Sequence, residues 1–470
     1  MDPTCWELSR SECACRRGEL EHACARMDRS RSDGSPMSHP AASTQTSGTC
    51  LIFVTNCYPF VPGEEFIESE IGHLASTFDR VLLIPVVRTV DQTRRREVPD
   101  NVEVILPEAL STTKASAGKV VRYTLRHPLR AAASFGRALR SFPHPWRMLS
   151  DLRLDLLACI VADQVQTTVQ EHLAPGTRTL LYSYWMMVPA RVATRLSARL
   201  GRHTVPVVSR AHGYDVFSER SAIDYLPQRE LLFSQISEVF TASRNGADYL
   251  RAKYPSFADR IETGRLGVGP ATAAGNVSQQ SFKVYTCAYL VPVKRIPLLI
   301  DGLATAQRRG LKVNWSHIGS GPADYAAEIQ RRAADQLDSG SFEFLGDLSN
   351  DEVRARYATS PGAVFVNVSE SEGVPVSIME ALAQGFPVIA TDVGGNSELI
   401  DTESGMFDGL LEGTPTADEI ADRLEALFTT ETGEYRRFVD ASMAQWRRNW
   451  SSDVNYAAFS DHLLQAAEPI

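Results

Sequence analysis

From residue 50 onward, short runs of β-branched and other apolar residues alternate with longer amphipathic stretches. The first unit has an apolar run at Cys50–Thr55, an amphipathic stretch at Glu64–Thr77 and a second apolar run at Val81–Val87. This rhythm is typical of β-strand, α-helix, β-strand units around a parallel sheet. Further strands are predicted at Thr179–Ser183, Val205–Ala211 and Val239–Ala242.

The same rhythm restarts after an irregular stretch rich in Gly, Ala and Asn at Gly267–Gln280. The pattern therefore predicts an α/β fold of two similar domains joined near this stretch. In the second domain, helices are predicted from Arg295 and Pro322, and strands at Lys283–Ala288, Val313–Gly319, Phe342–Leu345, Ala363–Asn367 and Val388–Thr391. Three helix-like segments follow with no further strand and are expected to pack on the outside: Ala417–Phe428, Gly433–Asn449 and Ser451–Ala467.

Cysteines gather at the beginning of the chain. Cys13 and Cys15, with His22 and Cys24, have the chemistry of a metal site, although their spacing fits no common zinc module. The alternative is an unfolded extension, or a start assigned too early, with Met37 as the true start. The expected parts are a disordered extension at 1–48, an N-terminal domain at 49–268, a C-terminal domain at 269–448 and a last helix at 449–470.

Composition limits the classes of function. A chain of 470 residues with 43 % apolar and 22 % charged residues is ordinary for globular domains. The run Val81–Val87 is far shorter than the about 18 residues that cross a bilayer, so we expect a cytoplasmic protein. Residues 1–270 carry 33 basic and 29 acidic residues (+4), and 271–470 carry 15 and 28 (−13), which gives a net charge of −9. This acidic balance argues against a nucleic-acid partner.

One segment departs from this balance. Arg122, Arg126 and Arg130 fall four apart, as on one helical face, and Leu, Phe and Trp are interleaved with them. Such a basic amphipathic stretch could bind an anionic membrane surface as a peripheral contact through 114–147. The sequence leaves open the alternative of a solvated helix that covers one side of the first sheet. Residues 109–150 hold no acidic residue but eight basic ones: Lys114, Lys119, Arg122, Arg126, Arg130, Arg137, Arg140 and Arg147.

Candidate chemistry concentrates in residues 364–395, which read as strand, loop, helix, strand and loop. Pro375 is predicted to be the first helical residue, so Glu372 lies in the preceding loop and Glu380 inside the helix. Backbone N–H groups of Gly373, Val374 and the first turn then suit a phosphate or sugar hydroxyls. A carboxylate accepts two hydrogen bonds side by side and can hold the vicinal hydroxyls of a ribose. Alternatively, Glu372 is a carboxylate at a helix start and Glu380 an exposed helix residue.

This stretch resembles the nucleotide-sugar signature of the retaining glycosyltransferases of family 4, the group 1 family. In that signature two glutamates eight apart contact the donor sugar and the nucleotide ribose, and Glu372 and Glu380 match them. The resemblance implies a catalytic role for Glu372 and donor binding by Glu380, Gly373, Val374 and Pro375. The other matching residues are Ala381, Gly385, Pro387-Val388, Gly394-Gly395 and Glu398.

Two further matches imply catalytic residues. Lys294 resembles the lysine that meets the donor diphosphate, where an ammonium stabilises the departing nucleoside diphosphate. Many members have an arginine five residues earlier, but this chain has Tyr289 there, and Arg295 is not at the matching position. His212 resembles the histidine after a strand that faces the donor sugar; without that resemblance, a lone histidine there would usually be structural.

Three loop segments complete the candidate binding site. Gly319, in His317-Ile-Gly-Ser-Gly-Pro322, either lets the backbone approach a ligand or makes a tight turn. Leu345 and Leu348 resemble the segment beside the nucleotide base, where backbone groups could read the ring edge. Gly63 lies in a loop that resembles the cleft-lining first loop of the family, with one glycine where many members have more.

The resemblance runs from about Cys50 to the C-terminus and is greatest for enzymes of the colanic-acid and exopolysaccharide type. It implies the GT-B fold, in which two Rossmann-like domains face each other across a cleft and the last helix crosses back. The implied reaction moves a hexosyl group from a nucleoside diphosphate to a sugar or lipid-linked oligosaccharide, with retention and without a cofactor. If the enzyme is peripheral, we expect it at the inner face of the plasma membrane. No metal is expected, because no Asp-x-Asp pair ends a strand and Lys294 with helix-terminal amides can neutralise the diphosphate.

Other function classes stay open. GT-B folds also include sugar phosphorylases and nucleotide-sugar epimerases, although the intact pair of glutamates favours a nucleotide donor. An inactive protein that binds sugar nucleotides is a third interpretation, supported only by Tyr289. The base, the sugar, the acceptor and the linkage depend on loop shape, which the pattern does not define.

Overall fold

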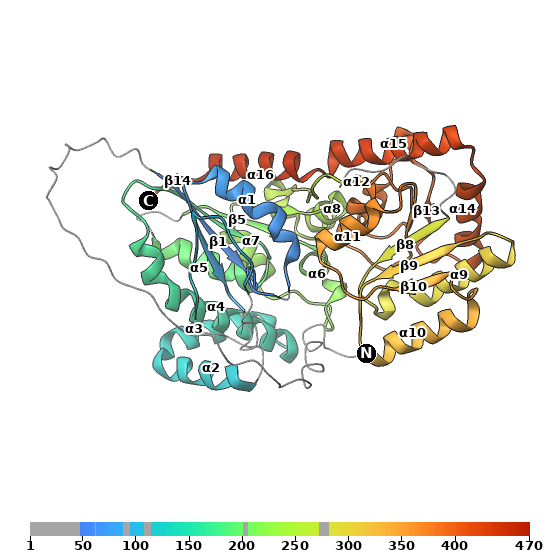
Figure 1. Ribbon diagram of the computed structural model, residues 1–470. Helices are drawn as coiled ribbons and strands as arrows, with labels where there is room; N and C mark the ends of the chain where they lie inside the picture. Colours follow the sequence, from blue (N-terminus) through green and yellow to red (C-terminus); the bar gives the residue numbers. More distant parts are fainter. Residues whose placement is uncertain (1–47, 62, 88–94, 108–113, 201–204, 272–281) are drawn as a thin grey trace, which may run out of the picture.

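Two parallel β-sheets, each flanked by helices, form the two halves of the molecule (Figure 1). The computed structural model describes residues 48–61, 63–87, 95–107, 114–200, 205–271 and 282–470. The expected extension with its cysteines and Met37 lies outside these residues, as does most of the predicted junction at 267–280. The predicted α/β fold with two parallel sheets is confirmed.

The N-terminal domain has an eight-stranded sheet in the order β3-β2-β1-β4-β5-β6-β7, with β14 paired to β4. Its parallel strands are β1 (Thr49–Thr55), β2 (Arg80–Pro85), β3 (Val102–Val104), β4 (Arg178–Ser183), β5 (Val207–Ala211), β6 (Glu238–Thr241) and β7 (Ile261–Thr263). Its helices are α1 (Glu68–Thr77), α2 (Lys114–Arg126), α3 (Pro128–Ala138), α4 (Pro145–Glu171), α5 (Val188–Leu200), α6 (Gly213–Val216), α7 (Arg229–Gln235) and α8 (Arg244–Lys253). The edge strands β3 and β7 were not predicted, because three residues are too few to show a pattern.

The C-terminal domain repeats this strand order in the sheet β10-β9-β8-β11-β12-β13. Its strands are β8 (Lys283–Cys287), β9 (Asn314–Ile318), β10 (Phe342–Phe344), β11 (Val364–Asn367), β12 (Val388–Thr391) and β13 (Leu410–Leu411). Its helices are α9 (Ile296–Arg308), α10 (Ala323–Gln336), α11 (Asn350–Ala358), α12 (Val376–Ala383), α13 (Asn396–Leu399), α14 (Ala417–Thr429) and α15 (Thr432–Asn449). In each sheet the strand order reverses beside the first strand of the domain, where α/β proteins bind ligands.

The central strands are apolar because each sheet is covered on both faces. Strand β1 is buried from Cys50 to its end. Ile52 and Val54 join the core on one side of the sheet, and Leu51 and Phe53 join the core on the other. Parallel strands buried on both faces are continuous apolar runs, and this is the signal that predicted them from sequence.

The chain returns to the N-terminal domain at its end. Helix α15 packs on α12, and α16 (Ser452–Ala466) packs on α1 (Figure 1). At the crossing, the N–H of Val268 donates to the carbonyl of Trp450 at 3.0 Å. The predicted return of the last helix is confirmed. The expectation of no further strand is wrong, because β14 (Glu468–Pro469) pairs antiparallel with β4; two polar or proline residues show no strand pattern and depend on the partner strand.

Two helix predictions also need correction. Helix α12 begins at Val376, because Pro375 has an extended backbone with ψ of 118° and caps the helix from outside. Arg122 and Arg126 lie in α2 but Arg130 lies in α3, so the three do not share one helical face. Pro128 causes this break: it has no N–H for a continuing helix and instead occupies the first turn of α3.

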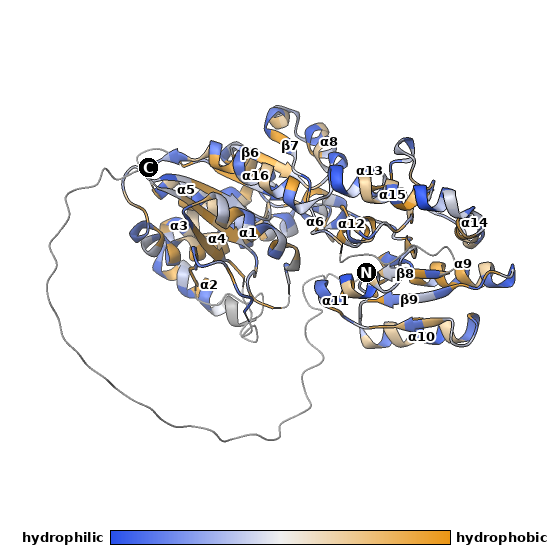
Figure 2. Cartoon of the chain, turned by 45° about the horizontal axis from the view of Figure 1, so that its top comes forward, coloured by the Kyte–Doolittle hydropathy of each residue, from blue (hydrophilic) through white to orange (hydrophobic). Residues whose placement is uncertain are grey.

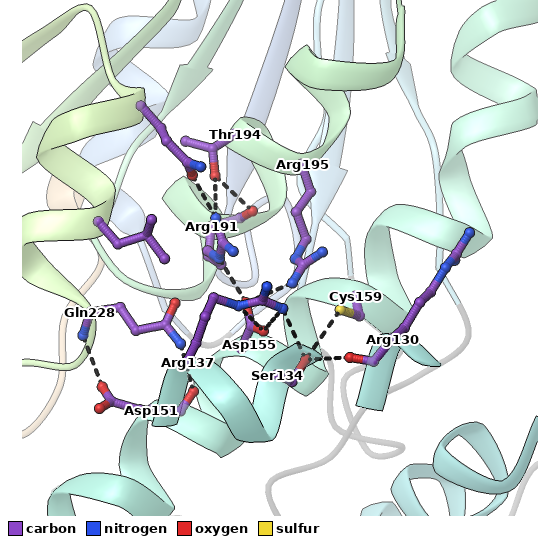
Figure 3. Close-up of polar contacts among 12 residues, drawn as sticks. Arg130, Ser134, Arg137, Asp151, Asp155, Cys159, Arg191, Thr194, Arg195 and Gln228 are labelled. Atoms are coloured by element: carbon purple, nitrogen blue, oxygen red, sulfur yellow. Dashed lines mark hydrogen bonds and ion pairs between the residues drawn. The ribbon is translucent and has the colours of Figure 1, made fainter. Parts of the chain in front are cut away.

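The long helix α4 places a fully buried carboxylate among three arginines of its neighbours (Figure 3). Asp155 accepts hydrogen bonds from Arg137 of α3 at 2.5 Å and from Arg191 and Arg195 of α5 at 2.8 and 2.7 Å. Burial raises the pKa of Asp155, but the guanidinium groups outweigh burial and hold it well below its usual range. The cluster therefore joins α3, α4 and α5 through one ionised carboxylate.

A second aspartate of α4 acts in the same way. Asp163 accepts hydrogen bonds from Arg130 of α3, from Arg199 of α5 at 2.6 Å and from the hydroxyl of Tyr123 at 2.6 Å. Arg130 and Arg137, two of the eight bases in the acid-free segment, are thus paired with acids that follow it in sequence. Counting charges within the segment missed this pairing.

A buried ion pair connects α1 to the end of β5 beneath α16. Arg210 Nη1 donates to Glu70 Oε2 at 2.9 Å, and neither side chain is exposed. The hydroxyl of Tyr182 donates to the other oxygen of Glu70 at 3.0 Å, and the guanidinium lies 4.0 Å from the ring centroid of Phe459 in α16. The pair therefore lies between the sheet of the first domain and the returning helix.

We expect Glu70→Ala to lower the free energy of unfolding by about 3–5 kcal/mol, because Arg210 would stay buried without its counter-charge. Glu68→Ala is the matched control on the same helix: its side chain is 45 % exposed and pairs with Arg96, so the loss should be below about 1 kcal/mol. Urea unfolding followed by circular dichroism measures both variants. Equal, small losses would contradict the importance of the buried pair.

Candidate active site

The candidate residues lie where strands of the two sheets end. His212 follows β5, Glu372 lies in the loop after β11, and Gly319 follows β9. In parallel α/β sheets, ligands bind outside the carboxyl ends of the strands. At this edge the domains touch, since a Cβ on Gly373 would lie 3.4 Å from the Cα of Gly213. Residues of both domains therefore border one interdomain site.

Glu372 is held by both domains. Its Oε1 accepts hydrogen bonds from Lys294 Nζ at 2.6 Å and from Asn367 Nδ2 at 3.1 Å. Its backbone carbonyl accepts a hydrogen bond from the guanidinium of Arg220 in the N-terminal domain. Because Glu372 is buried, the ammonium of Lys294 supplies the counter-charge that a buried carboxylate requires. The structure thus brings the two predicted residues Lys294 and Glu372 into contact.

The arginine next to Lys294 has a structural role. Lys294 ends a short 3₁₀ helix, Pro292–Lys294, and the guanidinium of Arg295 donates to the carbonyl oxygens of Val368, Ser369 and Gly413. Arg295 thereby fixes the loop that leads from β11 to Glu372. Tyr289 is exposed after β8, so the family's second cation is absent from that position.

Glu380 lies inside α12 with 8 % of its surface exposed, so the alternative of an exposed helix residue is wrong. Burial raises the pKa of this carboxyl to about 7, against the opposing charge of Arg354. Among the described residues, none donates a hydrogen bond to its side chain. A buried carboxylate without a donor is unusual in a folded protein, and such groups concentrate at functional sites.

The peptide between Glu372 and α12 is closely packed. The N–H of Gly395 donates to the carbonyl of Gly373 at 2.7 Å, and a Cβ on Gly394 would lie 1.9 Å from the carbonyl oxygen of Glu372. Val374 is half-buried and Pro375 is buried in front of α12. The first turn of α12 therefore begins directly behind Glu372, with its N–H groups at the loop.

A carboxylate of the C-terminal domain also caps a helix of the N-terminal domain. Glu398 accepts hydrogen bonds from the backbone N–H groups of Arg244 at 3.0 Å and Asn245 at 2.9 Å, at the beginning of α8. Negative charge is favourable at a helix N-terminus. Glu398, which matched the family signature, thus joins the two domains.

His212 lies among aromatic rings. Its imidazole stacks on Tyr184 with centroids 4.7 Å apart and contacts Trp185 at 4.4 Å. Neither ring nitrogen has a hydrogen-bond partner among the described residues. Burial and the charge of Arg210 lower its pKa well below the usual range, so the ring is neutral at physiological pH. A neutral imidazole can exchange one hydrogen bond with a ligand hydroxyl through each nitrogen.

The loop after β1 depends on a carboxylate that sequence reasoning missed. Glu64 accepts hydrogen bonds from backbone N–H groups of Asn56 and Cys57, at 3.0 and 2.6 Å, and from the indole of Trp185. Gly63 before it has φ of +118°, and a Cβ there would lie 2.8 Å from the sulfur of Cys57. Glu64 therefore orients the indole beside His212 through a contact 121 residues away in sequence, for which no local pattern exists.

The predicted base-binding segment lies at the edge of the second sheet. Gly319 has φ of +123°, which favours glycine, and its N–H donates to the carbonyl of Gly346 at 2.8 Å in an isolated β-bridge. The N–H of Leu345 donates to the carbonyl of His317 at 2.9 Å and is not free for a base. Leu345 and Leu348 pack partly buried against the core. Ligand contacts of Gly319, Leu345 and Leu348 stay predictions.

Arg220 is the second residue that sequence reasoning missed. It ends a 3₁₀ helix, Ser218–Arg220, and its guanidinium lies 4.6 Å from the ring centroid of Phe217. By donating to the carbonyl of Glu372 it brings a cation of the N-terminal domain to the residue whose carboxylate Lys294 contacts. Gly213 makes room for it, since a Cβ there would lie 2.2 Å from Arg220 Nη1. In the sequence, Arg220 is notable only for lying eight residues after His212, and no motif includes this spacing.

Two Rossmann-like domains that meet at their strand ends, with a last helix that crosses back, define the GT-B class. Residues 281–430, which include Lys294, Glu372 and Glu380, match the family model described as glycosyl transferases group 1. This part of the chain matches a group 1 glycosyltransferase domain, which confirms the resemblance to group 1; membership of family 4 and a retaining mechanism stay predictions.

Two relatives of this chain are also named as glycosyltransferases. The colanic acid biosynthesis glycosyltransferase WcaL of Escherichia coli K12 is 22 % identical over 277 residues, which are 57 % of this chain and 66 % of that protein. A GDP-mannose-dependent phosphatidylinositol monomannoside mannosyltransferase of Mycobacterium tuberculosis H37Rv is 25 % identical over 62 % of this chain and 70 % of its own length. The chain thus spans slightly less than two thirds of WcaL.

Solved structures show the fold. Alr3699/HepE of Anabaena, in complex with UDP, superimposes with a TM-score of 0.61 over 89 % of this chain and 100 % of that chain, at 18 % identity. The likeness extends across both domains and confirms the GT-B architecture. In the described ranges, no group of three or more His, Cys, Asp or Glu side chains could hold a metal ion.

We expect Glu380→Gln to stabilise the ligand-free protein at pH 8 by on the order of 2–3 kcal/mol and to change little below pH 4.5. The pKa of Glu380 is raised from 4.5 to about 7, so the folded state keeps a proton that the unfolded chain loses in this window. The destabilisation by the ionised carboxylate therefore grows from pH 4.5 and is complete above pH 7. Urea unfolding at several pH values measures it.

Glu370→Gln is the control for this experiment, because Glu370 is exposed ten residues earlier in the same region. Its effect on stability should show no such dependence on pH. A stabilisation by Glu380→Gln that is the same at pH 4 and pH 8 would contradict the raised pKa.

Proposed function

We propose that this protein is a retaining, metal-independent glycosyltransferase that moves a hexosyl group from a nucleoside diphosphate to an acceptor hydroxyl. The observation that carries the proposal is the contact of 2.6 Å between Lys294 and Glu372 where the domains meet, with the buried Glu380 eight residues further on. The group 1 domain at 281–430 supports the reaction class.

In the proposed donor complex, Glu380 accepts hydrogen bonds from both ribose hydroxyls, which a single ionised carboxylate can do. Lys294 and the first turn of α12 neutralise the diphosphate, since an ammonium and a helix N-terminus both favour negative charge. Leu345, Leu348 and Gly319 border the base, and the Gly63 loop lines the opposite wall. Glu372 and His212 hold the sugar between the two domains.

In the proposed reaction, the bond between the anomeric carbon and the diphosphate oxygen breaks, and its electron pair leaves with the nucleoside diphosphate. The acceptor oxygen forms the new bond on the same face of the sugar, and its proton passes to the departing phosphate oxygen. Negative charge grows on that phosphate, and preorganised cations stabilise it. Lys294 is one of these cations, and Arg220 supplies a second one from the opposite domain.

The proposed acceptor is a growing surface polysaccharide or a glycolipid. The names of two relatives, a colanic acid glycosyltransferase and a phosphatidylinositol mannoside mannosyltransferase, support this class. The mannosyltransferase is named for GDP-mannose, whereas the HepE structure contains UDP, so these proteins differ in their nucleotides. The base of the donor is therefore left to experiment.

Thermal-shift measurements with UDP, GDP and ADP test the donor class. A ligand that binds only the folded state stabilises it by about 2.7 kcal/mol at about 100 times its dissociation constant. We expect one of the three to raise the melting temperature, and its nucleotide sugar to yield free nucleoside diphosphate with acceptor in excess EDTA. Proton NMR of the product should show the donor's anomeric configuration.

Other outcomes identify other functions. Consumption of inorganic phosphate without nucleoside diphosphate release would indicate a sugar phosphorylase. Conversion of the sugar without acceptor would indicate an epimerase, and nucleotide binding without turnover over several acceptors would indicate a binding protein. Loss of activity in EDTA that Mg²⁺ restores would contradict metal independence.

Three substitutions separate the proposed roles by kinetics. Lys294→Ala should lower kcat about a hundredfold, because it removes charge stabilisation from the leaving group. Glu372→Ala should lower kcat more than donor affinity, whereas Glu380→Ala should chiefly raise the donor KM, since a ribose contact is made equally in ground state and transition state. Lys312→Ala and Glu370→Ala, exposed residues of the same domain, are the matched controls. Equal, small effects in all five variants would contradict these assignments.

A further inference from the structure

Exposed apolar side chains gather on the helices that lead into α4. Among the thirteen large apolar side chains that are exposed in the described part of the chain, eight fall within residues 121–149, at 46 % to 86 % exposure. Such a concentration marks an interaction site, because exposed apolar residues are otherwise scattered singly. These eight, together termed the α2–α4 surface, are Val121, Leu125, Leu129, Phe135, Leu139, Phe142, Trp146 and Leu149.

The α2–α4 surface belongs to the outer edge of the N-terminal domain. Figure 2 shows α2 and α3 on the side of this domain that faces away from α9 and α10. In Figure 1 they lie opposite α16, which covers the other side of the same sheet. Packing against the part of the chain that the structure describes therefore does not explain why these side chains are apolar.

The charge around the surface is positive. Arg130 and Arg137 are paired with Asp163 and Asp155, but Arg126 and Arg140 are exposed and have no ion pair with a described residue. Since residues 109–150 contain no acid, these two arginines have no opposing charge within the segment. Apolar side chains flanked by unpaired arginines are complementary to an anionic bilayer, whose acyl chains take up the former and whose phosphates bind the latter.

The surface is linked to the candidate active site. The hydroxyls of Ser141 and Tyr225 lie 3.1 Å apart, and Tyr225 donates to Asp151 of α4 at 2.9 Å. Asp151 also accepts the N–H of Gln228 at 2.9 Å (Figure 3). Tyr225 and Gln228 belong to the segment that follows His212 and Arg220. A structure bound to the α2–α4 surface thus lies next to the segment that contacts Glu372.

We propose that the α2–α4 surface binds an anionic lipid bilayer and so holds the active site beside a membrane-borne acceptor; only the acceptor rests on the proposed function. No helix in the described ranges is long and apolar enough to span a bilayer, so the proposed contact is peripheral. A symmetric contact with a second copy is disfavoured, because it would bring the basic α2–α4 surfaces of two copies together.

Co-sedimentation with vesicles tests the proposal without nucleotide or acceptor, so its failure is independent of the proposed reaction. We expect binding to vesicles of phosphatidylcholine with 30 % phosphatidylglycerol, and little binding to phosphatidylcholine alone. Arg126→Gln with Arg140→Gln should weaken binding tenfold or more, because each base contributes near an anionic surface. Leu125→Ser with Phe142→Ser should weaken it similarly without loss of folding, since both side chains are largely exposed.

Arg436→Gln with Arg437→Gln, two exposed arginines of α15, and Val454→Ser, an exposed apolar residue of α16, are the matched controls and should bind as the parent does. Hydrogen exchange should slow within 121–149 when vesicles are added. Equal loss in test and control variants, no binding to anionic vesicles, or a dimer that the α2–α4 substitutions dissociate would each overturn the proposal.

Discussion

The site depends on the contact between the Glu372–Gly373 peptide and the N-terminal domain. The carboxylate of Glu372 is fixed by Lys294 from its own domain, and its carbonyl by Arg220 from the other. Gly213 allows this approach, because a Cβ there would lie 2.2 Å from Nη1 of Arg220, and Gly373 lies in van der Waals contact with Gly213. Lys294 therefore stays beside the buried carboxylate in either case, whereas the second cation, Arg220, reaches Glu372 only while the domains are together.

The returning helix α16 packs over a buried ion pair that leads to the candidate site. α16 covers the ion pair of Glu70 and Arg210, and Arg210 also lies 5.9 Å from the ring centroid of Tyr184, on which His212 stacks. Buried charge, aromatic rings and the histidine thus form one continuous packed region from α16 to the strand ends. The neutral state of His212 follows from this packing, since burial and Arg210 both disfavour its charged form.

Features that depend on residues close together in the sequence could be predicted from it. The strands were predicted because burial on both faces produces unbroken apolar runs, and Glu372 with Glu380 because a fixed spacing carries them. Glu64, Arg220 and Asp155 were missed because their partners lie far away in sequence. The break at Pro128 had a readable local signal, which the regular spacing of the arginines obscured. The pairing of two bases of the acid-free segment was missed for a related reason: the acids that pair with Arg130 and Arg137 follow the segment on α4.

The two domains are joined by contacts that differ in the free-energy cost of breaking them. If Glu398 separates from α8, water can replace the two hydrogen bonds between its carboxylate and the backbone amides. No polar group is then left without a hydrogen-bond partner. If α16 leaves α1, the charges of Glu70 and Arg210 lose their apolar cover, which is far more costly. The contact of Glu398 with α8 is therefore expected to break at a lower free-energy cost than the contact of α16 with α1. Which of the two interdomain contacts breaks more easily thus depends on whether water can replace the interaction that is lost.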